Sequence, residues 1–505
     1  GPMPHTRFVL KKALEHGLQP IVLVNKIDRS DARPEEVVTE VFDLLVELEA
    51  DDDALDFPVI YGSGRDGWAS LDVETNGTDM RCVFETIVDR VPPPEVKPND
   101  PLQLLVTSID YSDYVGRIAI GRVTAGSISK AEPITVIKRD GRKVNGRVLE
   151  VHRFDGLGRE QVEKVGSGEI CAIVGLDDID IGDTIADRST PVALPSPPID
   201  EPTLHMTFRV NDGPFAGKEG EFVTSRQIMS RLDRELEVDV ALEVTPGDTP
   251  EEFQVSGRGL MHLGILLENM RREGYEVCAG RPRVIYREID GRTCEPIERL
   301  VIECPAETQS SVMSLIGDRR AELLEMGTRA SSDFVHMEFT IPARGLIGLR
   351  SRLLTATKGQ AIMHHNFHDY EPVRGTIPKR KAGVMISGET GAATAYTLDA
   401  LYDRGVFFVK PGETVYEGQV VGEHCKDSDI TVNVIRNKKL SNVRASGKDD
   451  QTMIKPPRVL SLEAALEYIQ DDELLEITPE SLRLRKRILK ESDRRRSSRR
   501  ATKSS

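Results

Sequence analysis

The chain has 505 residues, of which 39% are apolar and 30% are charged, and its formal net charge is −16. This length exceeds what one hydrophobic core organises, so we expect several domains, and the composition excludes a disordered chain. The acidic balance excludes indiscriminate binding to nucleic acid, because an acidic surface repels phosphate. No apolar run approaches the roughly 18 residues of a membrane-spanning helix and no secretory signal is visible, so we expect a cytoplasmic protein.

The first part of the chain alternates helices and strands. An apolar stripe at helical spacing predicts a helix that ends at Gly17, and a short buried strand is expected at 20–24. A second helix begins at Pro34, and another strand follows at 57–61. This alternation is typical of an α/β domain, whose end is marked by the proline run at 92–94.

The sequence Asn25-Lys26-Ile27-Asp28 directly follows the first predicted strand. At this place N-K-x-D is the guanine-binding motif of P-loop GTPases, because a carboxylate such as that of Asp28 accepts hydrogen bonds from guanine N1–H and N2–H₂, which adenine lacks. Asn25 would brace the loop and contact the base, and the stem of Lys26 would cover the ring. Ser63 follows the next strand and strengthens this interpretation. The alternative is a solvated turn before a helix.

A nucleotide site also needs a loop of the form G-x-x-x-x-G-K-[ST] and ligands for Mg²⁺. The sequence contains no such loop, and only one helix and one strand precede Asn25. Contacts to the base alone, at about 1 kcal/mol net per hydrogen bond, would leave an affinity that is roughly millimolar or weaker. We therefore expect GTP or GDP to bind weakly or not at all, Mg²⁺ to belong to the complete protein, and GTP hydrolysis to be absent, with no catalytic residue assigned.

The patterns change several times along the rest of the chain, which predicts a multidomain α/β and β fold. Helices are expected at 261–272, from Val312 to Leu324, and at 461–469. In chain order we expect a partial P-loop GTPase domain (1–93), a β-barrel (100–190), two ferredoxin-like α+β domains (200–290 and 296–376), a mixed β-rich C-terminal domain (377–489) and a basic disordered tail (490–505).

Several strings make the interpretation more specific. The order of modules resembles translational GTPases, and five strings resemble the BipA/TypA family. They are the glycine-rich loop Gly-Pro-Phe-Ala-Gly-Lys-Glu-Gly at 213–220 with 223–227, and the runs at 255–263, 343–352, 415–418 and 438–447. The last two are the most specific, since elongation factor G and LepA carry different modules there. The resemblance covers about residues 1–489. The family has Ala where this chain has Gly64, whose backbone N–H could still reach guanine O6.

The opening residues 1–8 resemble the family's stretch just past its D-T-P-G-H segment. We therefore expect the chain to begin inside the GTP-binding domain, without the P-loop, both switches and the catalytic His of the family. A Gly-Pro scar from a cleaved tag is a competing explanation of the first two residues. Natural truncation, an error in defining the gene and a cloned fragment remain open alternatives.

The resemblance implies a monomeric factor that binds the factor-binding and A-site region of the 70S ribosome. Its implied partners are 50S subunit rRNA and tRNA in the A site, and its implied roles are large-subunit assembly, translation regulation and stress response. The rival functions are a GTP-independent ribosome- or RNA-binding remnant and an elongation factor G-like translocase, which the C-terminal strings disfavour.

Two groups of basic residues are candidate RNA contacts. Lys438, Lys439, Arg444 and Lys448 form a compact basic loop suited to RNA phosphates and bases, with a charged hairpin tip as the alternative. Arg344, Arg350 and Arg352 form the second group, for which a salt-bridged strand is equally plausible. For the histidines at 364, 365 and 368, a packed or RNA-facing strand end is favoured over a metal site.

Overall fold

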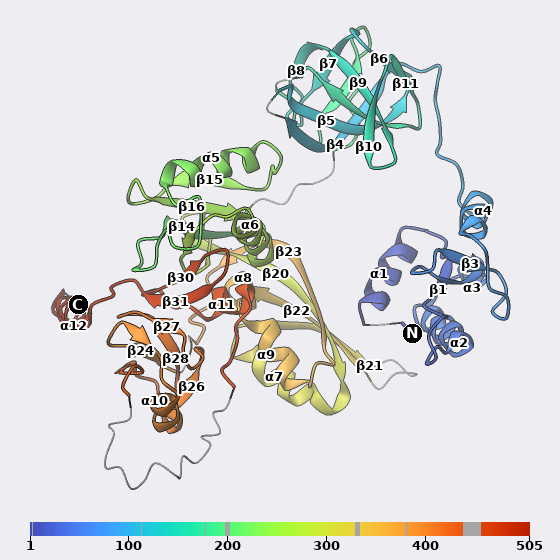
Figure 1. Ribbon diagram of the computed structural model, residues 1–505. Coiled ribbons are helices and arrows are strands. Elements are labelled where there is room, and N and C mark those ends of the chain that lie inside the picture. The colour runs from blue at the N-terminus through green and yellow to red at the C-terminus, as the bar shows by residue number, and fades with distance from the viewer. Residues whose placement is uncertain are drawn as a thin grey trace. The chain divides into compact units, whose positions relative to one another are not determined.

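The computed structural model describes residues 1–2, 4–112, 114–176, 178–196, 202–328, 334–378, 380, 382–437 and 456–504. Two compact units are present: residues 1–96 with 303–306 and 327–336 form the first, and the rest of the chain forms the second. The described fold is mixed α/β and rich in sheet (Figure 1). In the part of the chain that the structure describes, no helix is both long and apolar enough to cross a membrane.

The first unit contains a small sheet in the order β1-β2-β3, in which β1 and β2 are parallel and β2 and β3 antiparallel. Helix α2 begins at Pro34, whose fixed φ suits the first helical turn, and it buries Leu44 and Leu45. The predicted alternation is therefore confirmed. In order, the elements are α1 (Pro4–Glu15), β1 (Val22–Asn25), α2 (Pro34–Glu47), α3 (Asp52–Leu55), β2 (Val59–Ser63), β3 (Trp68–Ser70) and α4 (Arg81–Arg90).

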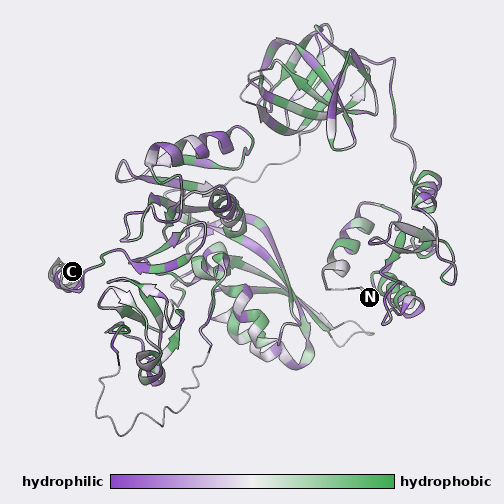
Figure 2. Cartoon of the chain, viewed as in Figure 1, coloured by the Kyte–Doolittle hydropathy of each residue, from purple (hydrophilic) through white to green (hydrophobic). Residues whose placement is uncertain are grey.

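An eight-stranded antiparallel sheet follows, in the order β10-β9-β12-β5-β4-β13-β7-β8. Apolar and hydrophilic residues alternate along its strands, and its buried core includes Leu104, Ile134 and Ile173 (Figure 2). Its strands are β4 (Gln103–Ser112), β5 (Gly116–Ala125), β7 (Pro133–Ile137), β8 (Lys143–Arg147), β9 (Glu150–Asp155), β10 (Gly158–Val162), β12 (Ile170–Val174) and β13 (Thr184–Asp187). Strands β6 (Ser127–Ser129) and β11 (Lys164–Gly166) pair with each other in a separate two-stranded sheet. Among the described residues no pairing joins β8 to β10, so closure into a barrel remains a prediction.

The next module mixes strands and two helices in the sequence β14-α5-β15-β16-α6-β17. Helix α6 confirms the helix predicted at 261–272. Its sheet has the order β15-β16-β14-β17 and continues into two strands from the end of the chain, β30 and β31. The bounds are β14 (Leu204–Val210), α5 (Ser225–Leu236), β15 (Glu243–Pro246), β16 (Glu252–Gly257), α6 (Leu260–Arg272), β17 (Val277–Ala279), β18 (Arg283–Val284), β30 (Glu473–Ile477) and β31 (Leu482–Lys486).

A second α+β module has strands in the order β19-β20-β22-β21, with β23 paired to β20. Its elements are β19 (Arg287–Ile289), β20 (Arg292–Pro305), the 3-10 helix η1 (Ala306–Thr308), α7 (Gln309–Gly317), β21 (Glu322–Thr328), β22 (Phe334–Pro342), α8 (Ala343–Leu346), α9 (Leu349–Ala356) and β23 (Ile362–Pro372). The prediction that a helix reaches Leu324 is wrong. The helix ends at Gly317, the chain turns through Arg320 with φ of 63°, and Leu323 and Leu324 lie in β21.

The C-terminal module contains a four-stranded sheet in the order β26-β28-β24-β29 and a short β25-β27 pair. Helix α11 confirms the helix predicted at 461–469. The prediction of a disordered tail is wrong for the described residues, which form α12 with two acidic residues in its first turn. The elements are β24 (Val384–Ser387), β25 (Gly391–Ala392), α10 (Ala395–Ala400), the 3-10 helix η2 (Tyr402–Arg404), β26 (Gly405–Phe407), β27 (Thr414–Val415), β28 (Val420–His424), β29 (Ile430–Val432), α11 (Leu462–Tyr468) and α12 (Glu491–Ser504).

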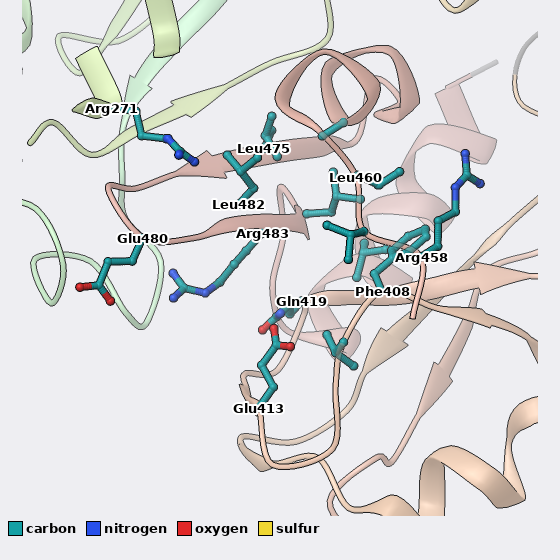
Figure 3. Close-up of a pocket in the computed structure, with 15 residues that line it drawn as sticks. Arg271, Phe408, Glu413, Gln419, Arg458, Leu460, Leu475, Glu480, Leu482 and Arg483 are labelled. Atoms are coloured by element: carbon teal, nitrogen blue, oxygen red, sulfur yellow. The ribbon is translucent and has the colours of Figure 1, made fainter. Parts of the chain in front are cut away.

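The C-terminal module shares a hydrophobic core with the 204–284 module. Strand β30 pairs antiparallel with β17, and Leu466 and Leu475 belong to the same buried cluster as Phe208 and Leu267. A cavity of about 250 Å³ remains at this junction, where the leucines of the β30-β31 hairpin lie opposite Leu460 (Figure 3). The two modules therefore behave as one packed body.

Candidate functional site

The guanine-binding motif lies at the carboxyl end of β1, next to the carboxyl end of β2. The two strands are parallel, and their register pairs Asn25 with Gly62. Ligand sites in parallel sheets lie outside the carboxyl ends of adjacent strands. The fold thus brings the motif beside Ser63, at the end of β2, and beside the second loop, which follows β2 and contains Gly64, although α2 and α3 lie between the two loops in the sequence.

The Asn25 side chain joins the two loops. Its Oδ1 accepts hydrogen bonds from the backbone N–H of Lys26 at 2.7 Å and of Gly64 at 2.9 Å. The backbone N–H of Ile27 donates to the carbonyl of Gly62 at 3.3 Å, which ties the loops a second time. This geometry supports the bracing role expected of Asn25.

Gly64 lies against Asn25. A Cβ at Gly64 would be 3.3 Å from Asn25 Nδ2 and 3.4 Å from Oδ1, so the Ala of the family would require a shift of a few tenths of an ångström here. The Gly64 N–H, which we expected to reach guanine O6, donates to Asn25 in this structure. Gly64 therefore has a bracing contact that sequence analysis did not anticipate.

The Asp28 carboxylate forms an ion pair with Arg65, with 3.0 Å between Oδ2 and the guanidinium. The Asp28 side chain is only 17% exposed, whereas Arg65 is 77% exposed. A guanine base bound there would therefore compete with a solvent-exposed cation for the Asp28 carboxylate. Sequence analysis missed Arg65; an opposite charge directly after the second loop was the available signal.

Ser63 acts through Asp66 rather than directly on Asp28. Ser63 Oγ donates to Asp66 at 3.0 Å, and Asp66 accepts two hydrogen bonds from Arg65 at 3.0 and 3.1 Å. The hydrogen bond from Arg65, followed by that from Ser63, lowers the pKa of Asp66. Asp66, which sequence analysis also missed, positions the cation that meets Asp28.

These residues fit a guanine base. Asn25 and Asp28 lie at one edge of the sheet, where Asn25 orders the loops and Asp28 presents an acceptor that only guanine among the common purines can satisfy with two donors. In the described ranges no group of three or more His, Cys, Asp or Glu residues is arranged to hold a metal ion.

The structure describes one of the two candidate RNA-contact groups and not the other. Arg344 donates to the buried Glu295 and to the carbonyls of Arg374 and Gly375, so its guanidinium is held within the protein. Arg350 and Arg352 are exposed on α9. The basic-loop residues Lys438, Lys439, Arg444 and Lys448 lie outside the described residues.

Comparison with known protein families gives four consecutive matches. They are the elongation factor Tu GTP binding domain (1–93), elongation factor Tu domain 2 (116–186), the elongation factor G C-terminus (292–381) and the TypA/BipA C-terminal domain (382–491). The guanine-binding motif lies within the first match, and the whole set describes a multidomain, GTPase-like chain.

Curated proteins from distant bacteria match nearly the whole chain. It is 50% identical to the large ribosomal subunit assembly factor BipA of Synechocystis sp., over 96% of this chain and 81% of that protein. It is 48% identical to the proteins of the same name from Bacillus subtilis, over 98% and 81%, and from Haemophilus influenzae, over 100% and 82%.

Proposed function

The chain belongs to the BipA/TypA family of translational GTPases, and on that premise we propose that it is a ribosome-binding factor acting in assembly of the large ribosomal subunit. The observation that carries this proposal is an identity of 48–50% with three proteins named large ribosomal subunit assembly factor, extending over 96–100% of this chain. We further propose that it works as a monomer in the cytoplasm and binds the 70S ribosome and 50S rRNA near A-site tRNA, with a role in stress response.

The finer architecture is part of the proposal. We propose that 100–190 closes into a β-barrel and that 200–290 and 296–376 are ferredoxin-like domains. Support for the latter is the helix-strand order together with the strand orders β15-β16-β14-β17 and β21-β22-β20-β23, which fit a split βαβ sandwich. The partial GTP-binding domain is assigned to 1–93 and the C-terminal ribosome-binding domain to 377–489.

For the nucleotide, we propose that Asp28 selects guanine and that Asn25, Lys26, Ser63 and Gly64 shape its site. In the complete protein, bound GTP would supply the phosphate that is hydrolysed. Together with Mg²⁺, the bound nucleotide would regulate docking to the ribosome. Because the sequence contains no G-x-x-x-x-G-K-[ST] loop, the chain as given is proposed to hydrolyse no GTP by itself.

Saturation-transfer NMR detects millimolar binding and tests the guanine site. GDP is expected to give a stronger signal than ADP, and Asp28→Asn should exchange this preference for XDP, because an amide donates where the carboxylate accepts. Asp31→Asn, an exposed carboxylate outside the motif, is the matched control. Equal binding of GDP and ADP would contradict guanine recognition. If the wild-type chain releases phosphate from GTP and the Asp28→Asn variant does not, the proposal that the chain hydrolyses no GTP is wrong.

For the ribosome, we propose that Lys438, Lys439 and Arg444, with Lys448, contact rRNA, and that Arg350 and Arg352 form a second contact. Support comes from the density of positive charge in the first group and the exposure of the second. Arg344 is reassigned to a structural role, because Glu295 and two carbonyls occupy its donors.

Co-sedimentation with 70S ribosomes and 50S subunits, across a salt series and with or without GTP, tests ribosome binding. Replacing Lys438, Lys439 and Arg444 by Ala should weaken binding and reduce its salt dependence, because fewer phosphate contacts release fewer counterions. Replacing the exposed Lys97, Arg142 and Arg272 by Ala removes equal charge elsewhere and is the control. No saturable binding, or equal loss in both triple variants, would contradict the proposal.

A further inference from the structure

A cavity of about 630 Å³ lies where the 287–372 module meets the C-terminal module. This volume is in the range of small-molecule sites. Its lining is rich in arginine, with three acidic residues, Asp318, Glu423 and Glu467, among them. The arginines are Arg281, Arg319, Arg344, Arg352, Arg380 and Arg458. All of these residues belong to the second unit, so the cavity is a feature of one compact body.

Carboxylates neutralise several of these arginines. Arg380 donates to the buried Glu473 at 2.9 and 3.0 Å, and Arg281 pairs with Asp471 at 3.2 Å. Arg344 is held by Glu295, as described above, and Arg458 lies 3.6 Å from Glu423. These four therefore contribute little unbalanced charge to the cavity.

Arg319 and Arg352 carry the excess charge, because neither forms an ion pair with any residue that the structure describes. Arg319 is 7% exposed and donates only to backbone carbonyls, those of Gly345 and, at 2.8 Å, Ile347. Burial and then the nearby Arg352 guanidinium lower the pKa of Arg319 to about 10, although the carboxylates of Glu467 and Asp318 act in the opposite direction. Two guanidinium groups thus repel each other, with Arg319 buried and Arg352 exposed, and an anion between them would stabilise both.

A carboxylate from the C-terminal module already occupies the anion position beside them. Glu467 of α11 accepts a hydrogen bond from Ser351 Oγ at 3.1 Å and lies beside Gly348 at the N-terminal end of α9, where an added Cβ would be 3.8 Å from Glu467 Oε2. Burial raises the pKa of Glu467, although Ser351, Gly348 and the charge of Arg319 act in the opposite direction. Glu467 is an internal anion held at a helix end that favours negative charge.

We propose that this cavity is a binding site for a phosphate-bearing anion, which is held between Arg319 and Arg352 and competes with Glu467 for the N-terminal end of α9. Guanidinium groups bind phosphate oxygens through paired donors, and a phosphate carries more negative charge than the carboxylate it would displace. The ligand is either a free diphosphate group or the phosphodiester backbone of RNA. The free-phosphate alternative goes beyond the proposed function, whereas the RNA alternative rests on it, because Arg352 is also part of the proposed rRNA contact; both are tested without ribosomes.

Isothermal titration calorimetry of the full chain tests the site with two probes, inorganic pyrophosphate and polyuridylic acid. Arg352→Ala should weaken binding about tenfold, the effect of losing a charge-assisted hydrogen bond. Arg292→Ala is the matched control, because Arg292 is an exposed arginine in β20 of the same module, outside both the cavity lining and the proposed rRNA contacts. Glu467→Gln should tighten binding several-fold, since it removes the competing charge.

Both variants Arg292→Ala and Arg352→Ala change exposed side chains, so their unfolding midpoints should match that of the wild type. If Arg352→Ala selectively weakens the binding of pyrophosphate, the ligand is a free phosphate compound. If Arg352→Ala weakens the binding of polyuridylic acid alone, the ligand is RNA backbone. Either result supports the site. The proposal is overturned by equal losses in Arg292→Ala and Arg352→Ala, by the absence of saturable binding with both probes, or by a Glu467→Gln variant that binds no more tightly.

Discussion

Replacing Glu276 by Gln tests how the glycine-rich loop is held. The Glu276 side chain is fully buried, and its carboxylate accepts four hydrogen bonds. The donors are Asn211 Nδ2 at 3.1 Å and the backbone N–H groups of Gly217 at 2.9 Å, Glu219 at 3.2 Å and Gly220 at 2.8 Å. One buried carboxylate therefore accepts from three backbone N–H groups of the loop.

The cost of the substitution follows from this geometry. Each carboxylate oxygen of Glu276 accepts two of the four hydrogen bonds, so an amide nitrogen in either position leaves two donors facing another donor. Hydrogen bonds to a charged group are worth about 1.5–3 kcal/mol each. Glu276→Gln should therefore lower the free energy of unfolding by about 3–6 kcal/mol, although Gln has the same shape.

The loss should extend to the C-terminal module, because the loop contacts it through Phe215. The Phe215 and Tyr416 rings meet edge to face with centroids 5.1 Å apart, and the Arg483 guanidinium lies 5.3 Å from the Phe215 centroid. Arg483 also pairs with Glu219 of the same loop. A loosened loop would weaken these contacts together.

Urea unfolding and hydrogen exchange measured on peptides spanning the loop give the two readouts. Glu276→Gln should shift the unfolding midpoint to lower urea and accelerate exchange at Gly217 and Gly220. Glu251→Gln, an exposed carboxylate of the same module, should do neither. An unfolding free energy within about 0.5 kcal/mol of wild type, with unchanged exchange, would refute the assigned role of Glu276.

Three further outcomes are expected. The Thr224 hydroxyl caps α5 by accepting a hydrogen bond from the backbone N–H of Gln227. Thr224→Ala should therefore lower the free energy of unfolding by about 1 kcal/mol, measured with urea. An unchanged midpoint would contradict the capping box. Gly217→Ala should cost about 1–2 kcal/mol in the same assay because φ is +74°; a stabilised variant would exclude this left-handed conformation. Under native conditions a thiol reagent should label exposed Cys425 first, and Cys278, whose pKa burial raises to about 11, only on unfolding; early labelling of Cys278 would contradict its burial.

Local patterns in the sequence determined a large part of the fold. The alternation of helix and strand before residue 93, the helices α6 and α11, and the position of Asn25 to Asp28 at the end of a strand all follow from short-range periodicity and end signals. The sequence shows the glycine-rich loop as a string of residues, and the structure shows why one of its positions needs glycine. A Cβ at Gly220 would lie 2.5 Å from Glu276 Cγ.

Two expectations drawn from local patterns were wrong, one because of a turn followed by strand pairing and the other because of ion pairing within a helix. Leu323 and Leu324 continue the helical spacing of α7, yet the turn after Gly317 places them on a strand paired with β22. The basic C-terminal residues form α12, where Arg495 pairs with Glu491 one turn earlier. Neither outcome is encoded in the spacing of apolar residues alone.

Contacts between distant segments were decided only by the tertiary structure. Strand β30 joins β17 across about 200 residues of sequence, Arg65 meets Asp28, and Arg344 turns inward to Glu295 instead of outward to RNA. Each of these contacts depends on which strand edge, carboxylate or cavity the folded chain brings close. The sequence around a charged side chain does not indicate which residue will be its partner. Sequence analysis therefore locates the chemical groups, whereas burial and the pairing of remote strands determine which of them meet.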